Sequence, residues 1–332
     1  MEKIIDTDYL FLTTRVRTLE NSLLSRDRMT RMLEARTATE AAGVLIECGY
    51  PEISPLNINT LQEALAAEQR RTYHDLYSLA PNPALFDVFR VRYDYHNGKV
   101  LLKGAAVGTD ATHLLLDMGR IPVRELKETF LSGDFRGLPA AFQEAVIRAK
   151  EILHTEEDPQ KTDFVLDRAC YSEMLHMAGQ LGSAFLLGYV RISIDAANLR
   201  AAVRTLRIGK DADFLKEILF EGGNVSVQRV LDGVSPGGSL ADIFARSSLR
   251  EAAEAGMGAV AGDRMTKFEK LCDDSVNDYL KRAKLVSFGE APVIAYLAAK
   301  ENELTAVRII LTGRMADLPA EMIQERLRDA YV

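Results

Sequence analysis

The first residues that could do chemistry in this 332-residue chain form a Gly-x-Ser-x-Gly stretch, "GVSPG" (233–237). In a hydrolase elbow of this form, the residue after the serine donates its backbone N–H to an oxyanion. Here that residue is Pro236, which has no N–H, and no buried strand leads into the stretch. We therefore interpret Ser235 as part of a Gly/Ser/Pro loop and not as a nucleophile.

Other candidate chemical groups fail on their spacing. "RIGKDAD" (207–213) contains Gly-Lys, but it lacks the next Ser or Thr and the earlier glycine of a phosphate loop. The histidines never occur at ligand spacing and are expected to be surface or satisfied residues: His74, His96, His113, His154 and His176. The sequence therefore predicts no catalytic residue, no cofactor and no metal site.

Composition and charge narrow the class of protein. The 47% hydrophobic and 27% charged content is that of a globular protein with full cores. A net charge of −7 argues against nucleic acid as a partner. The acidic start "MEKIIDTDYLFL" is unlike a signal peptide, and the apolar runs are too short to cross a bilayer. The three cysteines, Cys48, Cys170 and Cys272, are widely spaced and fit a reducing cytoplasm. Because no apolar run could cross a bilayer, we expect a soluble protein.

Apolar residues recur at helical spacing along nearly the whole chain. Ser25 is placed to cap one helix, and Thr37 with Glu40 three residues later has the form of a capping box. Strand-like alternation is weak and confined to "NVSVQRV" (224–230). The sequence predicts an all-α protein with short loops.

One pattern occurs three times. "DYHNGKVLLKGAAVG", "DAANLRAAVRTLRIG" and "AKENELTAVRIILTG" each carry an Asn, a basic residue six positions later and a glycine eleven positions later. The asparagines are separated by 101 and then 104 residues, which indicates one helical unit written three times. The three sets are Asn97, Lys103, Gly108; Asn198, Arg204, Gly209; and Asn302, Arg308, Gly313.

The repeat decides between two interpretations of Asn97-Gly98. Taken alone, this dipeptide is a strong hairpin signal. The other copies have Leu199 and Glu303 in place of Gly98, both in helix-forming surroundings. We therefore predict a glycine tolerated inside a helix, at a cost of about 1 kcal/mol relative to Ala.

Each copy's terminal glycine is predicted to be a left-handed residue just past a helix. The acids that follow, Asp110, Asp211 and Asp317, are placed to cap the next helix. The repeated amide and basic positions have two possible roles: they shape the repeat through salt bridges within each domain, or they line a shared axis that binds partners. The candidate partner-binding residues are Lys103, Arg200, Arg204 and Arg308.

The third copy and the chain end, "FGEAPVIAYLAAKENELTAVRIILTGRMADLPAEMIQERLRDAYV" (288–332), resemble the C-terminal signature of a known family. This family comprises the C subunits of archaeal and bacterial A/V-type rotary ATPases, related to the d subunit of vacuolar ATPases. The resemblance extends to "RVRTLENSLLSRDRMTRMLEARTATEAAGVLIECGY", "RVRYDYHNGKVLLKG" and "NLRAAVRTLRIGKD", and so covers the chain end to end.

The resemblance implies three similar helical domains about a pseudo-threefold axis, forming a funnel; we place them at 1–110, 111–212 and 213–332. It implies a non-catalytic rotor subunit on the cytoplasmic side of the membrane. Such a subunit is a socket between the central stalk (subunits D and F) and the proteolipid ring, and it couples ATP turnover to H⁺ or Na⁺ transport. No small-molecule substrate is expected.

Two alternatives stay open: a free-standing helical scaffold that binds soluble partners, and an all-α enzyme with an unrecognised site. Association with proteolipid separates the rotor subunit from the scaffold, and a cavity of perturbed acids or histidines would indicate the enzyme.

Overall fold

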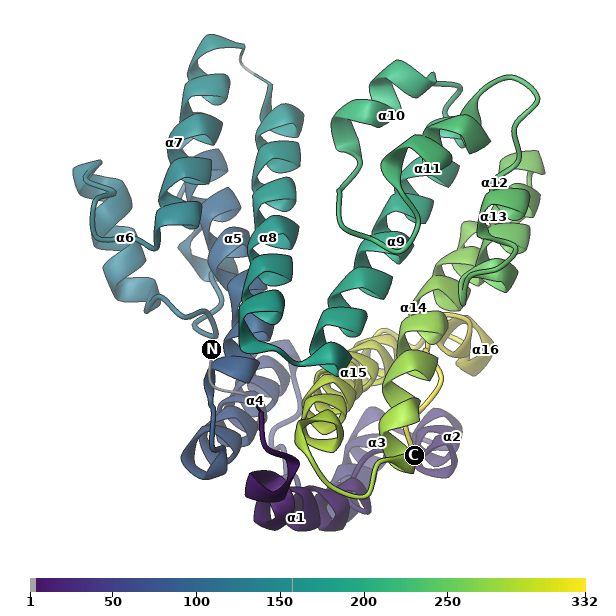
Figure 1. Ribbon diagram of the computed structural model, residues 1–332. Coiled ribbons are helices and arrows are strands. Elements are labelled where there is room, and N and C mark those ends of the chain that lie inside the picture. Colours follow the sequence, from purple (N-terminus) through teal and green to yellow (C-terminus); the bar gives the residue numbers. More distant parts are fainter. Residues whose placement is uncertain (1–3, 157) are drawn as a thin grey trace. The chain divides into compact units, whose positions relative to one another are not determined.

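The computed structural model describes residues 4–156 and 158–332, and within these ranges it contains helices and no strand, which confirms the all-α prediction (Figure 1). The described residues divide into two compact units. Unit 1 is Ala84–Gly238, and unit 2 combines 4–83 with Ser239–Val332. The three-domain division stays a prediction.

Unit 1 is built on three long helices, with α8 packed against both α5 and α9. Helix α7 lies beside α8 in the antiparallel sense (Figure 1). Its helices are α5 (Ala84–Val107), η3 (Thr112–Leu114), α6 (Val123–Ser132), α7 (Ala140–Thr155), α8 (Pro159–Leu181), α9 (Ala184–Arg207), α10 (Ala212–Ile218) and α11 (Val227–Val234).

Unit 2 is built around α15, which is buried along most of its length because α1, α2, α3, α4, α14 and α16 all pack against it. Its first helices are η1 (Asp6–Tyr9), α1 (Leu10–Glu20), α2 (Arg26–Glu34), α3 (Ala38–Gly43), η2 (Val44–Cys48) and α4 (Ile58–Leu79). The others are α12 (Leu240–Phe244), α13 (Arg250–Ala261), α14 (Met265–Lys281), η4 (Arg282–Leu285), α15 (Glu290–Met315) and α16 (Ala320–Gln324).

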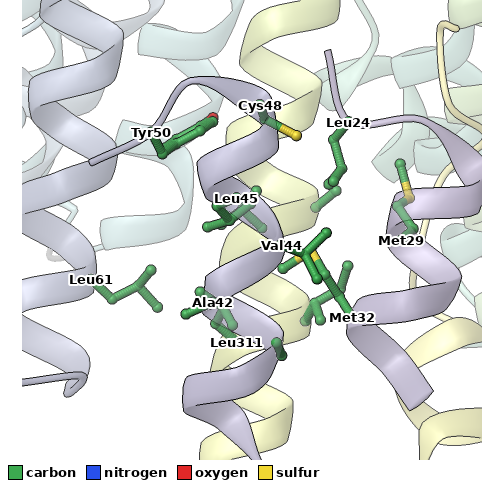
Figure 2. Packing of buried hydrophobic residues seen from close by; sticks show 14 of the residues in the cluster. Leu24, Met29, Met32, Ala42, Val44, Leu45, Cys48, Tyr50, Leu61 and Leu311 are labelled. Atoms are coloured by element: carbon green, nitrogen blue, oxygen red, sulfur yellow. The ribbon is translucent and has the colours of Figure 1, made fainter. Parts of the chain in front are cut away.

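The apolar core of unit 2 joins the two ends of the chain. Figure 2 shows Met32 of α2, Leu45 of η2 and Leu311 of α15 converging in one cluster, and all three are fully buried. Fully burying a side chain of this size stabilises the fold by about 1.5–3 kcal/mol. The N-terminal and C-terminal segments are therefore held together by a shared core and not by a linker.

The capping interactions predicted at the helix starts are found only in part. Ser25 caps α2 as predicted, because its side chain accepts a hydrogen bond from the Arg28 N–H. Thr37 caps α3 in the same way, but the Glu40 carboxylate accepts from the N–H of Arg36 and not of Thr37, so the predicted capping box is incomplete. "NVSVQRV" is not strand-like: Ser226 caps α11.

Helix α5 runs without interruption through Asn97-Gly98, which confirms the helix and excludes the hairpin. Gly98 is buried, and a Cβ there would lie 3.1 Å from Cζ of Phe142 on α7. The glycine is therefore more than tolerated, because it allows close approach of α7 to α5.

Candidate functional site

Two of the three repeated asparagines hold a distant backbone segment against a long helix. Asn97 on α5 is fully buried; its side chain donates to the Leu116 carbonyl and accepts from the Leu116 N–H, both at 2.8 Å. Asn198 on α9, also fully buried, makes the same pair with Phe220, at 2.7 and 2.8 Å. An amide side chain suits this task because it carries both a donor and an acceptor.

Asn302 does not repeat this arrangement. It lies exposed on α15, and its side-chain nitrogen donates to Oδ1 of Asn277 on α14 at 2.6 Å. The alignment of Asn302 with Asn97 and Asn198 therefore does not correspond to equivalent contacts.

A buried carboxylate lies one helical turn before Asn97 and another one turn before Asn198. Each accepts a hydrogen bond from the backbone segment that the asparagine binds, at a position a few residues later in the chain. Asp94 accepts from the Ile121 N–H at 3.1 Å, and its other oxygen accepts from the Arg120 guanidinium at 2.8 Å. Asp195 accepts from the Val225 N–H at 3.0 Å, and its other oxygen accepts from Asn224. Hydrogen bonds to an ionised acceptor are stronger than those between neutral groups.

Glycines let the segment come this close. A Cβ at Gly119 would overlap Oδ1 of Asp94, and a Cβ at Gly223 would overlap Oδ1 of Asp195. Each glycine stands two residues before the N–H that the carboxylate binds. Side chains at these positions would push the segment off the helix.

Glu303 makes the corresponding contact in unit 2. It is buried on α15 and accepts from the Leu24 N–H at 2.6 Å, and its other oxygen accepts from the Tyr50 hydroxyl at 2.6 Å. Ser22, which has a Cβ, stands where the other copies have glycine, and the carboxylate is the longer Glu.

The three carboxylates share a register that the sequence pattern missed. Each lies fourteen residues before a left-handed residue at its helix's end: Gly108 (φ 68°), Gly209 (φ 68°) and Asp317 (φ 52°). Each binds an N–H two residues before the start of a short helix, namely α6, α11 and α2. We call these contacts the three carboxylate clamps: Asp94–Ile121, Asp195–Val225 and Glu303–Leu24.

Gly313 is consequently not a helix end, which corrects the prediction. It lies inside α15, and its φ is not positive. A Cβ there would lie 2.7 Å from Cγ1 of Ile323, so the glycine is needed for close packing of α16. The prediction that an acid after each glycine caps the next helix is confirmed for Asp211, which caps α10. Asp317 is instead the left-handed residue that follows the end of α15.

Burial decides the direction of the pKa shift at the two clamps of unit 1, and neighbouring charges decide it beside the clamp of unit 2. It raises the pKa of Asp94, against the opposing hydrogen bond from Arg120. It also raises the pKa of Asp195, although the N–H groups that this carboxylate accepts act in the opposite direction. In unit 2, burial alone would lower the pKa of Lys300, but Glu303 and Glu68 outweigh it and the pKa is raised.

None of the remaining chemical candidates is a partner in the three carboxylate clamps, although His96 lies 3.2 Å from the Leu114 carbonyl on the segment that Asp94 and Asn97 hold. Ser235 follows α11 and donates its hydroxyl to the Leu231 carbonyl at 2.9 Å, and the five histidines are exposed. No group of three His, Cys, Asp or Glu that could hold a metal occurs in residues 4–156 and 158–332. What the clamps can do is mechanical, because they fix the starts of short helices on long ones.

Comparison with known proteins decides the family. The model of the ATP synthase (C/AC39) subunit family matches residues 12–326. The chain belongs to this family.

Relatives of this family member match it at nearly full length. The C subunit of the V-type sodium ATPase of Enterococcus hirae is 24% identical over 98% of this chain and 99% of its own. The C subunit of the A-type ATP synthase of Methanocaldococcus jannaschii is 26% identical over 96% of this chain and 86% of its own. That of Methanosarcina acetivorans is 23% identical over 97% of this chain and 93% of its own. The resemblance seen in the sequence is confirmed, and the chain is a rotary ATPase subunit.

The predicted partner-binding residues of this C/AC39 family member lie on α5, α9 and α15, the helices that carry the clamp carboxylates. Lys103 on α5 forms an ion pair with Asp163 on α8 at 2.6 Å, which is a salt bridge between two helices of unit 1. The two residues fall in different predicted domains, 1–110 and 111–212, so the pair is not the salt bridge within one domain that was expected. Arg200 and Arg204 follow each other by one turn on α9; the first is half-buried and the second exposed. Arg308 on α15 is exposed and pairs with no other residue in the described part of the chain. Their convergence on an axis stays a prediction.

No described helix of this family member is long and apolar enough to cross a membrane.

Proposed function

We propose that the chain is the non-catalytic rotor subunit that links the central stalk to the proteolipid ring of an A/V-type ATPase. The observation that carries this proposal is the family match over residues 12–326, together with relatives of nearly equal length that are named as C subunits of such complexes. The protein would sit on the cytoplasmic side of the membrane, accept subunits D and F, and couple ATP turnover to H⁺ or Na⁺ transport. It would need no cofactor and no substrate of its own.

The carboxylate clamps support a threefold repeat, although each clamp joins residues from two of the segments 1–110, 111–212 and 213–332. Three long helices, each with a buried carboxylate, a left-handed end and a gripped short helix, are what three related units would contain. The third clamp binds Leu24 from the N-terminal part, so the third unit would be completed by the start of the chain. Related units about one axis would form a socket without any special motif.

A socket that transmits torque also needs polar contacts around its apolar ones. We propose that Lys103, Arg200, Arg204 and Arg308 provide them by facing the shared axis. Arg204 is the best test, because it is exposed and its helix is fixed by the Asp195 clamp.

Affinity purification tests the proposal. A tag on the chain, with membranes solubilised in mild detergent, should recover proteolipid together with subunits D and F. Recovery of soluble partners without proteolipid would favour the scaffold. Calorimetric titration of the isolated chain with ATP and Mg²⁺ should show no binding, and micromolar binding would overturn the non-catalytic role.

A matched pair of charge reversals tests the axis. Arg204→Glu should weaken binding to the D–F stalk or to the ring while the chain stays folded. Arg246→Glu, an exposed arginine outside the repeat, should change neither. Equal effects of the two variants would remove the special role of Arg204.

A further inference from the structure

Unit 2 exposes an apolar surface where two segments far apart in sequence meet. One segment is Ile5, η1 and the start of α1, and the other is the end of η4 with the loop before α15. Phe11 is 69% exposed and Leu285 is 91% exposed. We call this surface the apolar face; its residues are Ile5, Leu10, Phe11, Leu285, Val286 and Phe288.

The two segments are fastened to each other. The Thr13 hydroxyl donates to the Gly289 carbonyl at 3.1 Å and accepts from the Gly289 N–H at 3.3 Å. The Arg17 guanidinium donates to the carbonyls of Ala283 and Val286 at 2.7 and 2.8 Å. The apolar face is therefore preformed, and a partner that binds it would not have to order it first.

Two acidic residues beside the apolar face have no counter-ion among the residues that the structure describes. Asp6 and Asp8 are exposed, and neither forms an ion pair with any residue of 4–156 or 158–332. Asp6 lies against Gly289, where a Cβ would come within 3.3 Å of its Oδ1. Lys284, which precedes Leu285 of the apolar face, lies 4.8 Å from the centre of the Tyr331 ring.

We propose that the apolar face docks a partner protein that presents apolar side chains next to a Lys or Arg. Exposed apolar patches of this kind mark interaction sites, and the two carboxylates call for a cationic neighbour. An anionic lipid surface fits poorly, because Asp6 and Asp8 would face lipid charges of their own sign. A second copy of this chain would bring its own Asp6 and Asp8 to the interface and add like charges.

Photo-cross-linking in the assembled complex tests this docking. A benzophenone amino acid at position 11 or 288 of the full chain should cross-link to one protein, at a peptide that combines apolar residues with a Lys or Arg. The matched control is position 131, where Leu131 is 86% exposed in unit 1. It should give no cross-link to that peptide.

A second set of variants tests the contacts themselves. Phe11→Ala should weaken retention of that partner about tenfold, as truncation of a buried anchor does. The double variant Asp6→Asn, Asp8→Asn should lower the cross-linking yield at least about threefold, and added salt should do the same. These positions are exposed, so the fold should be unchanged by circular dichroism.

Four results would overturn the proposal: adducts with lipid only, adducts with a second copy, a yield no greater than at position 131, or a yield indifferent to the two aspartates. This inference rests on the chain acting within a complex. If the chain still co-purifies with the ATPase while positions 11 and 288 capture nothing, the docking face is wrong and the proposed function stands.

Discussion

Replacing the asparagines at equivalent sequence positions should have very different effects on stability. Asn198→Ala removes both hydrogen bonds between the fully buried Asn198 side chain and Phe220, and leaves the part-buried N–H and carbonyl of Phe220 without these partners. Each net hydrogen bond contributes about 1 kcal/mol and each unsatisfied buried group costs about 1–3 kcal/mol, so the expected loss is about 2–5 kcal/mol. Asn302→Ala removes one part-buried hydrogen bond, to the buried Asn277. Because Asn302 itself is exposed, water can take the place of its side chain, and the variant should cost less than about 1 kcal/mol.

Chemical denaturation followed by circular dichroism measures both losses, and hydrogen exchange locates them. The Phe220 N–H should exchange faster in Asn198→Ala than in the parent chain, while Asn302→Ala should leave it protected. Because the chain has two compact units, the exchange data identify which one is destabilised. Equal losses of stability in the two variants would refute the conclusion that Asn198 holds a distant backbone segment while Asn302 does not.

Three further predictions follow from the same contacts. Gly209→Ala should destabilise the protein by about 1–2 kcal/mol in thermal unfolding, because the φ of Gly209 is 68°, although the space around it is open. Gly137 also lies in open space but has no positive φ, so Gly137→Ala should not destabilise the protein. Equal effects of the two variants would contradict this prediction. Burial raises the folded-state pKa of Asp195 above its usual 3.8, so the contribution of Asp195 to stability is present below about pH 4 and is lost as the pH rises through the folded-state pKa. The stability of the parent relative to Asp195→Asn should therefore fall as the pH rises over that range. A rise would contradict the prediction. Lys103→Ala should cost at most about 1 kcal/mol, since its pair with Asp163 is partly exposed, and a simultaneous loss of stalk binding would show a direct contact with the partner.

The sequence could predict what depends on neighbours along the chain. The helix through Gly98 was predictable because the second and third copies have helix-forming residues in its place. The left-handed ends at Gly108 and Gly209 were predictable because eleven residues is close to three helical turns. Asn97 and Asn198 were correctly selected as repeated positions, although their backbone partners were not foreseen.

What the sequence could not predict depends on partners distant along the chain. Asp94 and Asp195 begin the two aligned stretches and so were visible as a repeat, but their roles rest on N–H groups 27 and 30 residues later. Glu303 escaped because it lies four residues out of the aligned register and binds Leu24, near the other end of the chain. Gly313 matched the glycine position by spacing alone, while its packing against Ile323 is a tertiary contact.

The proposed function has one central claim, that this protein couples ATP turnover to ion transport without catalysing either step. The most direct test is the ratio of ions moved to ATP hydrolysed by membrane vesicles that contain the complex, measured with the chain depleted and then added back. The account predicts that depletion abolishes ATP-driven transport while ATP hydrolysis continues, and that the purified chain restores transport. Transport that persists at the same ratio without the chain would contradict it.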